Sequence, residues 1–127
     1  MPRLARGGRW VYGWAIVGPG LVLSIPPEAW RKYGFQANGE ALVLRGSRTS
    51  RGFALANAAR FPAHLATRVL GSGRFTGDGR VALPASAHAG SGDRLLVVLG
   101  SGHALGFLAR GPIYQMALEH DDIEVFA

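Results

Sequence analysis

Three arginines in one short stretch carry the clearest chemistry in this sequence. Residues 45–53 read RGSRTSRGF, which spaces Arg45, Arg48 and Arg51 three apart among glycine, serine and threonine. Guanidinium groups form paired hydrogen bonds with phosphate oxygens, so this stretch is a candidate phosphate-binding loop. The alternative interpretation is a surface turn, because glycine and serine are common turn residues.

A second basic stretch lies at the beginning of the chain. The sequence MPRLARGGRW places Arg3, Arg6 and Arg9 three apart, with two glycines between the last two. Such a segment is typical of a flexible arm that follows a phosphate backbone or enters a minor groove. A disordered terminus without this role is the alternative, since order is commonly lost at chain ends.

The charge is divided unevenly along the chain. The net charge is +6, with ten basic and two acidic residues in 1–70 but four basic and six acidic residues in 71–127. A basic half followed by the acidic tail EHDDIEVFA predicts an anionic partner, and nucleic acid is the leading candidate. Other basic residues near the expected helices are interpreted as solvated: Arg31, Lys32, Arg60 and Arg68.

Residue patterns that would indicate an enzyme or a metal site are missing from the sequence. The chain has no cysteine, and its histidines (His64, His88, His103 and His120) show no metal-ligand spacing. The glycine-rich stretch 71–79 lacks the Gly-Lys-Ser/Thr ending of a phosphate-binding P-loop. No serine stands in a recognisable nucleophile motif. We therefore expect a non-enzymatic protein without cofactor or metal.

Residues 10–27 contain no charge and raise the question of a membrane segment. They include Gly18-Pro19-Gly20 and end in two prolines, both of which break a helix. They are also rich in residues that favour strands. The sequence therefore predicts two strands joined by a turn at 18–20, no membrane partner and a cytoplasmic location.

An internal repeat provides a second copy with which the arginine stretch can be compared. Sliding the chain by 54 residues places ALVLRGSRTSRGFAL (41–55) on LLVVLGSGHALGFLA (95–109). The matched pairs are Gly46 with Gly100, Ser47 with Ser101, Gly52 with Gly106, and Phe53 with Phe107. The pairs that differ are Arg45 with Leu99, Arg48 with Gly102, and Arg51 with Leu105. The shared positions suit a hairpin, and the arginines are an addition to one copy.

The repeat divides the chain into parts of a single domain covering 1–127. Residues 11–57 form the first repeat, 58–78 a helix and glycine-rich connector, 79–110 the second repeat, and 111–127 a C-terminal helix and acidic tail. Pro27 and Gly34 bound a short helix in the first repeat, whereas the second has room for about one turn. Further helices are expected in 61–70 and 111–120.

The order of these parts resembles the AbrB/MazE/SpoVT swapped-hairpin family. The carrying motifs are GRVALP followed by GSGDRLLVV, and GLVLSIPPEAWRKYGFQANGEALVL, in which Glu40 replaces the usual Asp. Two copies in one chain look like the tandem arrangement of MraZ proteins. The resemblance implies an interlaced β-barrel and DNA binding by a basic surface, in transcription regulators or antitoxins. The short second helix and the arginine-free second loop depart from that pattern.

The sequence therefore predicts a mainly β protein with short helices, a duplicated AbrB-like swapped-hairpin β-barrel with pseudo-twofold symmetry. We expect a non-enzymatic DNA-binding regulator, favouring DNA over RNA and a homodimer over other assemblies. The predicted contacts are Arg45, Arg48 and Arg51, with Arg3, Arg6 and Arg9 of the arm. The alternative is an interaction or oligomerisation module, including antitoxin-like partner binding, that uses the C-terminal helix and acidic tail.

Overall fold

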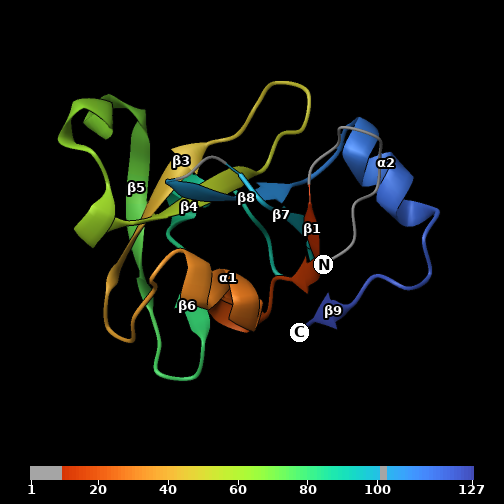
Figure 1. Ribbon diagram of the computed structural model, residues 1–127, viewed down its shortest axis with the longest axis horizontal. Helices are drawn as coiled ribbons and strands as arrows, with labels where there is room; N and C mark the ends of the chain where they lie inside the picture. The colour runs from red at the N-terminus through yellow and green to blue at the C-terminus, as the bar shows by residue number, and fades with distance from the viewer. Residues whose placement is uncertain (1–9, 101–102) are drawn as a thin grey trace.

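One sheet of nine strands dominates the part of the chain that the computed structural model describes, residues 10–100 and 103–127. The sheet has the order β2-β6-β5-β3-β4-β8-β7-β1-β9 and curls into a nearly closed barrel (Figure 1). The strands are β1 (Val11–Ile16), β2 (Val22–Ser24), β3 (Glu40–Arg45), β4 (Phe53–Asn57), β5 (Val69–Phe75), β6 (Arg80–Ala82), β7 (Arg94–Val98), β8 (Ala104–Leu108) and β9 (Val125–Phe126). The helices are α1 (Pro27–Lys32) and α2 (Pro112–Leu118), with 3₁₀ turns η1 (Pro19–Leu21), η2 (Ala58–Arg60), η3 (Ala63–Arg68) and η4 (Ala85–Ala87).

The strands pair across the two halves of the chain rather than within each half alone. β1 pairs with β7, and β5 pairs with β3, so the first strand of each half lies beside the third strand of the other. β2 pairs with β6 and β4 with β8, all antiparallel. At the seam between the edge strands, the Ser24 hydroxyl donates to the carbonyl oxygen of Ala127 at 2.8 Å. This bond links the two edges.

Local sequence signals explain several element boundaries. Helix α1 begins at Pro27, carries Glu28 in its first turn, and ends before Gly34, whose φ of 67° suits a residue without a side chain. The predicted turn at 18–20 joins β1 to β2, so the prediction of two strands in 10–27 is confirmed. No helix within 10–100 and 103–127 has the length and apolar character needed to span a membrane.

The helix expected in 61–70 is shorter than predicted and is a 3₁₀ helix, and the connector expected in 71–79 is wrong for the residues that form a strand. Residues 63–68 form the 3₁₀ turn η3, and residues 69–75 form strand β5. The glycines of this strand allow close approach: a Cβ on Gly73 would collide with the carbonyl oxygen of Ala82. β5 lies between β6, the next strand along the chain, and β3, about thirty residues earlier, and local sequence gave no sign of the pairing with β3.

The predicted alignment of the two halves, with a constant offset of 54 residues, is wrong for the strands that follow the hairpin loops. Leu44 pairs with Ala54, ten residues later, whereas Val98 pairs with Gly106, eight residues later. The second hairpin is thus two residues shorter, and the predicted matches of Gly52 with Gly106 and Phe53 with Phe107 do not hold in register. The extra length of the first hairpin lies in its arginine-bearing loop.

Alternate residues of the strands fill the barrel. Val43, Leu55 and Phe107 are fully buried, and the Phe53 and Phe107 rings stack at 4.9 Å between centroids. Helix α2, predicted within 111–120, covers the outside of β1, β7 and β8, and its Tyr114 packs on the Trp14 ring at 5.0 Å. The acidic tail continues into β9, which runs parallel to β1.

Candidate nucleic-acid interface

The arginine-bearing loop, which we take as Arg45, the last residue of β3, together with residues 46–52, forms a turn between β3 and β4. The N–H of Arg51 donates to the carbonyl oxygen of Ser47 at 2.9 Å, and the N–H of Ser50 donates to the Ser47 hydroxyl at 3.0 Å. Arg51 and Gly52 both take left-handed backbone angles, with φ of 55° and 72°. The serine and glycine of this stretch thus shape the turn, as the sequence predicted.

Gly46 and Gly100 occupy matching places at the start of the two hairpin loops. A Cβ on Gly46 would collide with the carbonyl oxygen of Arg51, and a Cβ on Gly100 would collide with that of Ala104. Both hairpins therefore bring backbone too close for a side chain. The predicted hairpin role of this repeated glycine is confirmed.

The loop is also fixed to the chain that follows β8. The carbonyl oxygen of Ser50 accepts hydrogen bonds from the N–H of Ala109 at 3.0 Å and of Arg110 at 2.9 Å. The Arg110 guanidinium donates to the carbonyl oxygen of Arg48 at 3.4 Å. These contacts hold the loop backbone and bring a fourth arginine beside it.

The guanidinium groups of the three loop arginines are exposed and lack a protein anion. Arg45, Arg48 and Arg51 form no ion pair with any residue that the structure describes. Several other arginines are engaged: Arg74 donates to the carbonyl oxygen of Asn38 at 2.7 Å, and Arg94 lies 4.1 Å above the Trp14 ring. The loop arginines are therefore available to an external anion.

Two adjoining hollows gather the arginines around the loop. The larger, of about 750 Å³, is lined by Arg45, Arg48, Arg51 and Arg110, and is called the arginine hollow below. The second, of about 650 Å³, shares Arg45 and Arg51 and adds Arg68. Asp93 is the single acidic residue among the described lining residues, and its carboxylate accepts the N–H of Gly90 at 2.7 Å. Five arginines thus face one carboxylate.

Sequence reasoning missed two of these five arginines. Arg68 was interpreted as solvated, and Arg110 was not singled out. Arg110 lies 62 residues from Arg48, whose carbonyl oxygen it contacts. Only the fold brings them together, so spacing along the chain held no signal for Arg110.

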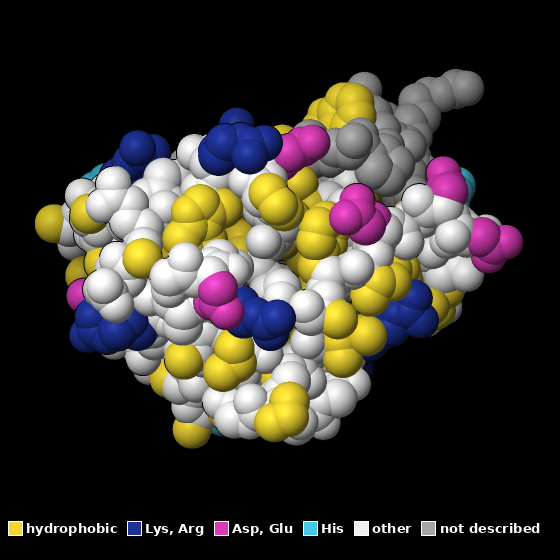
Figure 2. All heavy atoms as spheres, turned by 90° about the horizontal axis from the view of Figure 1, so that it is seen from below, with side chains coloured by type: hydrophobic (Ala, Val, Ile, Leu, Met, Phe, Trp, Pro, Cys, Tyr) yellow, Lys and Arg dark blue, Asp and Glu magenta, His cyan; other side chains and the backbone are white. Residues whose placement is uncertain are grey.

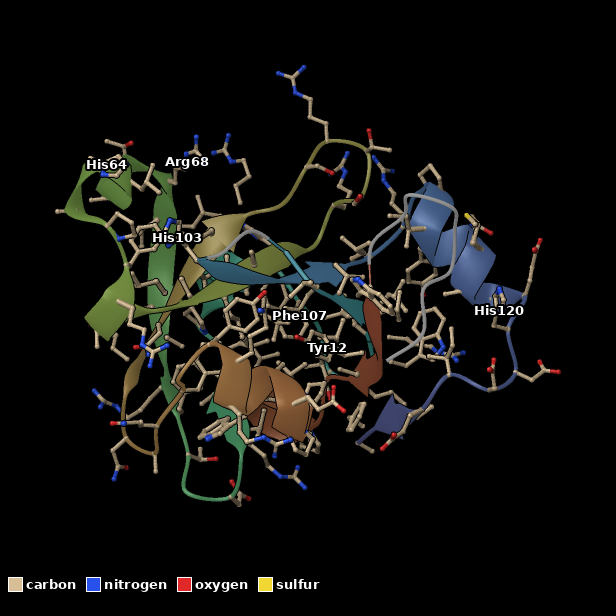
Figure 3. All side chains as sticks on the ribbon, viewed as in Figure 1. Tyr12, His64, Arg68, His103, Phe107 and His120 are labelled. Atoms are coloured by element: carbon tan, nitrogen blue, oxygen red, sulfur yellow. The ribbon has the colours of Figure 1, made fainter. Side chains whose placement is uncertain are left out.

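The hairpin between β3 and β4 projects on the side of the barrel opposite α1 (Figure 1). Arg68 extends on that same upper side (Figure 3). The face seen from below, by contrast, mixes basic, acidic and apolar side chains (Figure 2). There Arg80 pairs with Asp78 at 3.3 Å. Arg3, Arg6 and Arg9 lie outside the described residues.

The resolved pKa shifts belong to tyrosines in the core and to one surface aspartate. Burial raises the pKa of Tyr33 to about 12, while the hydrogen bond from the N–H of Gly100 lowers it in part. Burial, with Glu28 nearby, also raises the pKa of Tyr12. The hydroxyl of Thr76 lowers the pKa of the exposed Asp78. Within the described ranges no three His, Asp or Glu side chains gather as a metal site.

Comparison with protein-family models, with curated proteins and with solved structures gave no match. A concave surface with five exposed arginines and one carboxylate has an excess of positive charge and many hydrogen-bond donors, which suit an anion.

Proposed function

We propose that this protein is a non-enzymatic DNA-binding protein, a transcription regulator of AbrB-like type. One observation carries the proposal: five exposed arginines surround two adjoining hollows with a single carboxylate among them. Affinity would come mainly from neutralising backbone phosphates, since guanidinium forks match phosphate oxygens. The arm residues Arg3, Arg6 and Arg9 would extend this surface along the duplex.

We further propose that the barrel consists of two interlaced AbrB-like copies related by a pseudo-twofold axis. The strand registers support this relation. Trp14 pairs with Leu96, and Leu42 pairs with Ser72. Adding 58 to the number of Trp14 gives Ser72, and adding 54 to that of Leu42 gives Leu96, so each pair is the counterpart of the other.

Backbone angles support the same two offsets. Leu21 and Gly79, 58 apart, have φ of 60° and 79°, and Asn38 and Gly92, 54 apart, have φ of 66° and 92°. Left-handed angles are uncommon for residues other than glycine. Their recurrence at matching positions favours duplication of one unit, with four residues absent from the connector that precedes the hairpin of the second copy.

The salt dependence of DNA affinity tests the proposed function. Replacing Arg45, Arg48 and Arg51 with alanine should lower the slope of log Kd against log salt by about 3 per chain. If a homodimer uses both loops, six contacts would give a wild-type slope near −5 in log K, by the relation of about 0.9 per phosphate. Fluorescence anisotropy with a duplex probe measures it between 50 and 200 mM salt.

The matched control variant removes three positive charges from the face of the barrel on which α1 lies, away from the arginine hollow. R31A, K32A and R80A together change the net charge equally, and Arg31 and Arg80 line a separate hollow with Asp78. This variant should keep most of the slope. Equal slopes for the wild type and the loop variant, with both folded by circular dichroism, would refute the proposal.

A further inference from the structure

The two proposed copies differ in how one end of each hairpin is covered. Helix α1 belongs to the first copy and lies beside the hairpin of the second copy, β7–β8. The N–H of Gly100 donates to the hydroxyl of Tyr33, just after α1, at 3.3 Å, and Leu99 packs against the core. In the second copy, the 3₁₀ turn η4 takes the place of α1. The arginine hollow lies between η4 and the first hairpin, because both Gly46 and Ala87 line it.

The four residues absent from the second copy can be identified from backbone and burial. Ala29 and Ala87, 58 apart, are both buried, and each lies three residues after the proline that precedes its helix or turn, Pro26 or Pro84. Gly34 and His88, 54 apart, both have left-handed angles, with φ of 67° and 53°. The offset therefore changes between these positions, and the missing residues correspond to 30–33.

Those four residues include two large aromatic side chains. In the first copy the Trp30 ring packs on Phe75 at 5.4 Å, and the Tyr33 ring stacks on Phe35 at 5.7 Å. The second copy has no counterpart of Trp30 or Tyr33, and the counterpart of Phe35 is Ala89, which lines the arginine hollow. Aromatic volume that fills one end of the barrel is thus replaced by open space at the other.

The arginine hollow carries charged side chains at its rim, whereas the equivalent position at the other end of the barrel is apolar. Arg45 corresponds to Leu99, which is covered in the first copy. The wall also contains Ser86, whose hydroxyl oxygen is buried and has no hydrogen-bond partner among the described residues. Guanidinium groups bind phosphate oxygens and also stack on aromatic faces. The hollow has both charged and apolar lining residues, and its volume of about 750 Å³ lies in the range of small-ligand sites.

We propose that the arginine hollow binds a nucleoside phosphate. The base takes the space that Trp30 and Tyr33 occupy at the other end, and the phosphate binds the guanidinium groups at the rim. The nucleotide is either free or the 5′-terminal unit of a strand, because both present the same chemistry. This inference uses the proposed equivalence of the two copies and does not require duplex DNA binding.

Isothermal titration calorimetry without DNA tests this site, with adenosine 5′-monophosphate and thymidine 5′-monophosphate as probes. We expect saturable binding with a Kd below about 1 mM for at least one nucleotide, in the usual range for small ligands of modest affinity. Adenosine, thymidine and inorganic phosphate should each bind at least about tenfold more weakly, since each lacks half of the contacts. No nucleotide binding, or phosphate binding as tightly as the nucleotides, overturns the proposal.

A variant that fills the arginine hollow distinguishes nucleotide binding from DNA binding. A89F adds the ring that Phe35 supplies at the other end and keeps all five arginines. Nucleotide affinity should fall at least tenfold, while the salt slope for duplex DNA stays unchanged. The control A63F adds a ring on η3, at an exposed position that lines neither hollow, and should leave both unchanged. Unchanged nucleotide affinity in a folded A89F refutes the site.

Two further measurements complete the test. If A89F fails to fold, R110A serves instead, because Arg110 lines only the arginine hollow of the two, and nucleotide affinity should fall at least threefold. An unchanged affinity in R110A then refutes the site. Competition by 5′-phosphorylated and 5′-hydroxyl oligothymidine distinguishes the sources: stronger competition by the phosphorylated strand indicates a terminal nucleotide, and competition by neither strand indicates a free one. Equal, strong competition by both strands overturns the proposal, because internal phosphates would then suffice for binding.

Discussion

The two hairpins of the barrel, β3–β4 and β7–β8, share a glycine that lies close to a backbone carbonyl oxygen, and they differ in the residues around that glycine. Each begins its loop with a glycine, Gly46 or Gly100, whose Cα approaches a carbonyl oxygen of the returning strand. The second hairpin is two residues shorter, and its Gly100 donates a hydrogen bond to the hydroxyl of Tyr33, which directly follows α1. The first is longer, carries three arginines, and lies against the chain after β8. The difference separates residues that shape a hairpin from residues that face a ligand.

This comparison also shows why arginine appears at one end only. Leu99 packs against the barrel core beneath α1, where a charged group would lose its hydration without compensation. Arg45 lies at an end without that helix and stays exposed. The shortened connector and the arginine loop are thus parts of a single structural difference.

The largest expected loss of stability comes from removing an aromatic side chain at the end of the barrel that α1 covers. F35A removes a ring that is 3% exposed and stacked on Phe75 at 4.2 Å, so unfolding free energy should fall by about 3–5 kcal/mol. At the open end, A89G should cost only about 0.5–1 kcal/mol, from backbone entropy. Urea denaturation measures both. A loss under 1 kcal/mol for F35A would contradict the asymmetry of the two ends.

A smaller effect is expected from the backbone of the arginine loop. In G52A the new Cβ meets the carbonyl oxygen of Phe107 at a residue with φ of 72°, so stability should fall by about 1–3 kcal/mol. G77A, where nothing lies within 4 Å, should stay within about 0.5 kcal/mol of wild type. Thermal melting compares them, and equal melting temperatures would show that the loop lacks this close contact.

The smallest effect concerns the hydroxyl that joins α1 to the second hairpin. Y33F removes the acceptor of the Gly100 N–H and should cost about 1 kcal/mol at pH 7. Because the folded pKa of Tyr33 is raised to about 12 from 10, its stabilisation is complete below pH 10 and declines as pH rises toward 12. Melting curves at pH 8 to 11.5 should decline less steeply for Y33F. Part of the decline remains, since the pKa of Tyr12 is also raised.

Local signals predicted those elements whose cause is local. Pro27 and Gly34 bounded α1, and Gly18-Pro19-Gly20 predicted the turn between β1 and β2, because proline and glycine restrict or free the backbone at their own positions. Strand β5 was missed because its glycines weaken the local signal for a strand, while its longer pairing is with β3, about thirty residues away. The hairpin register was misjudged since glycine and phenylalanine recur two residues out of step in the second copy.

The sequence by itself determined the three-residue spacing of the loop arginines, the repeated glycine before each loop, and the short second connector. These are properties of neighbouring residues. Only the tertiary structure decided that Arg68 and Arg110 join the loop arginines and that an open hollow lies where the other end holds α1. The physical reason is that strand pairing across the two halves places Arg110 at the same hollow as Arg45, 65 positions earlier, and no local pattern encodes such a contact.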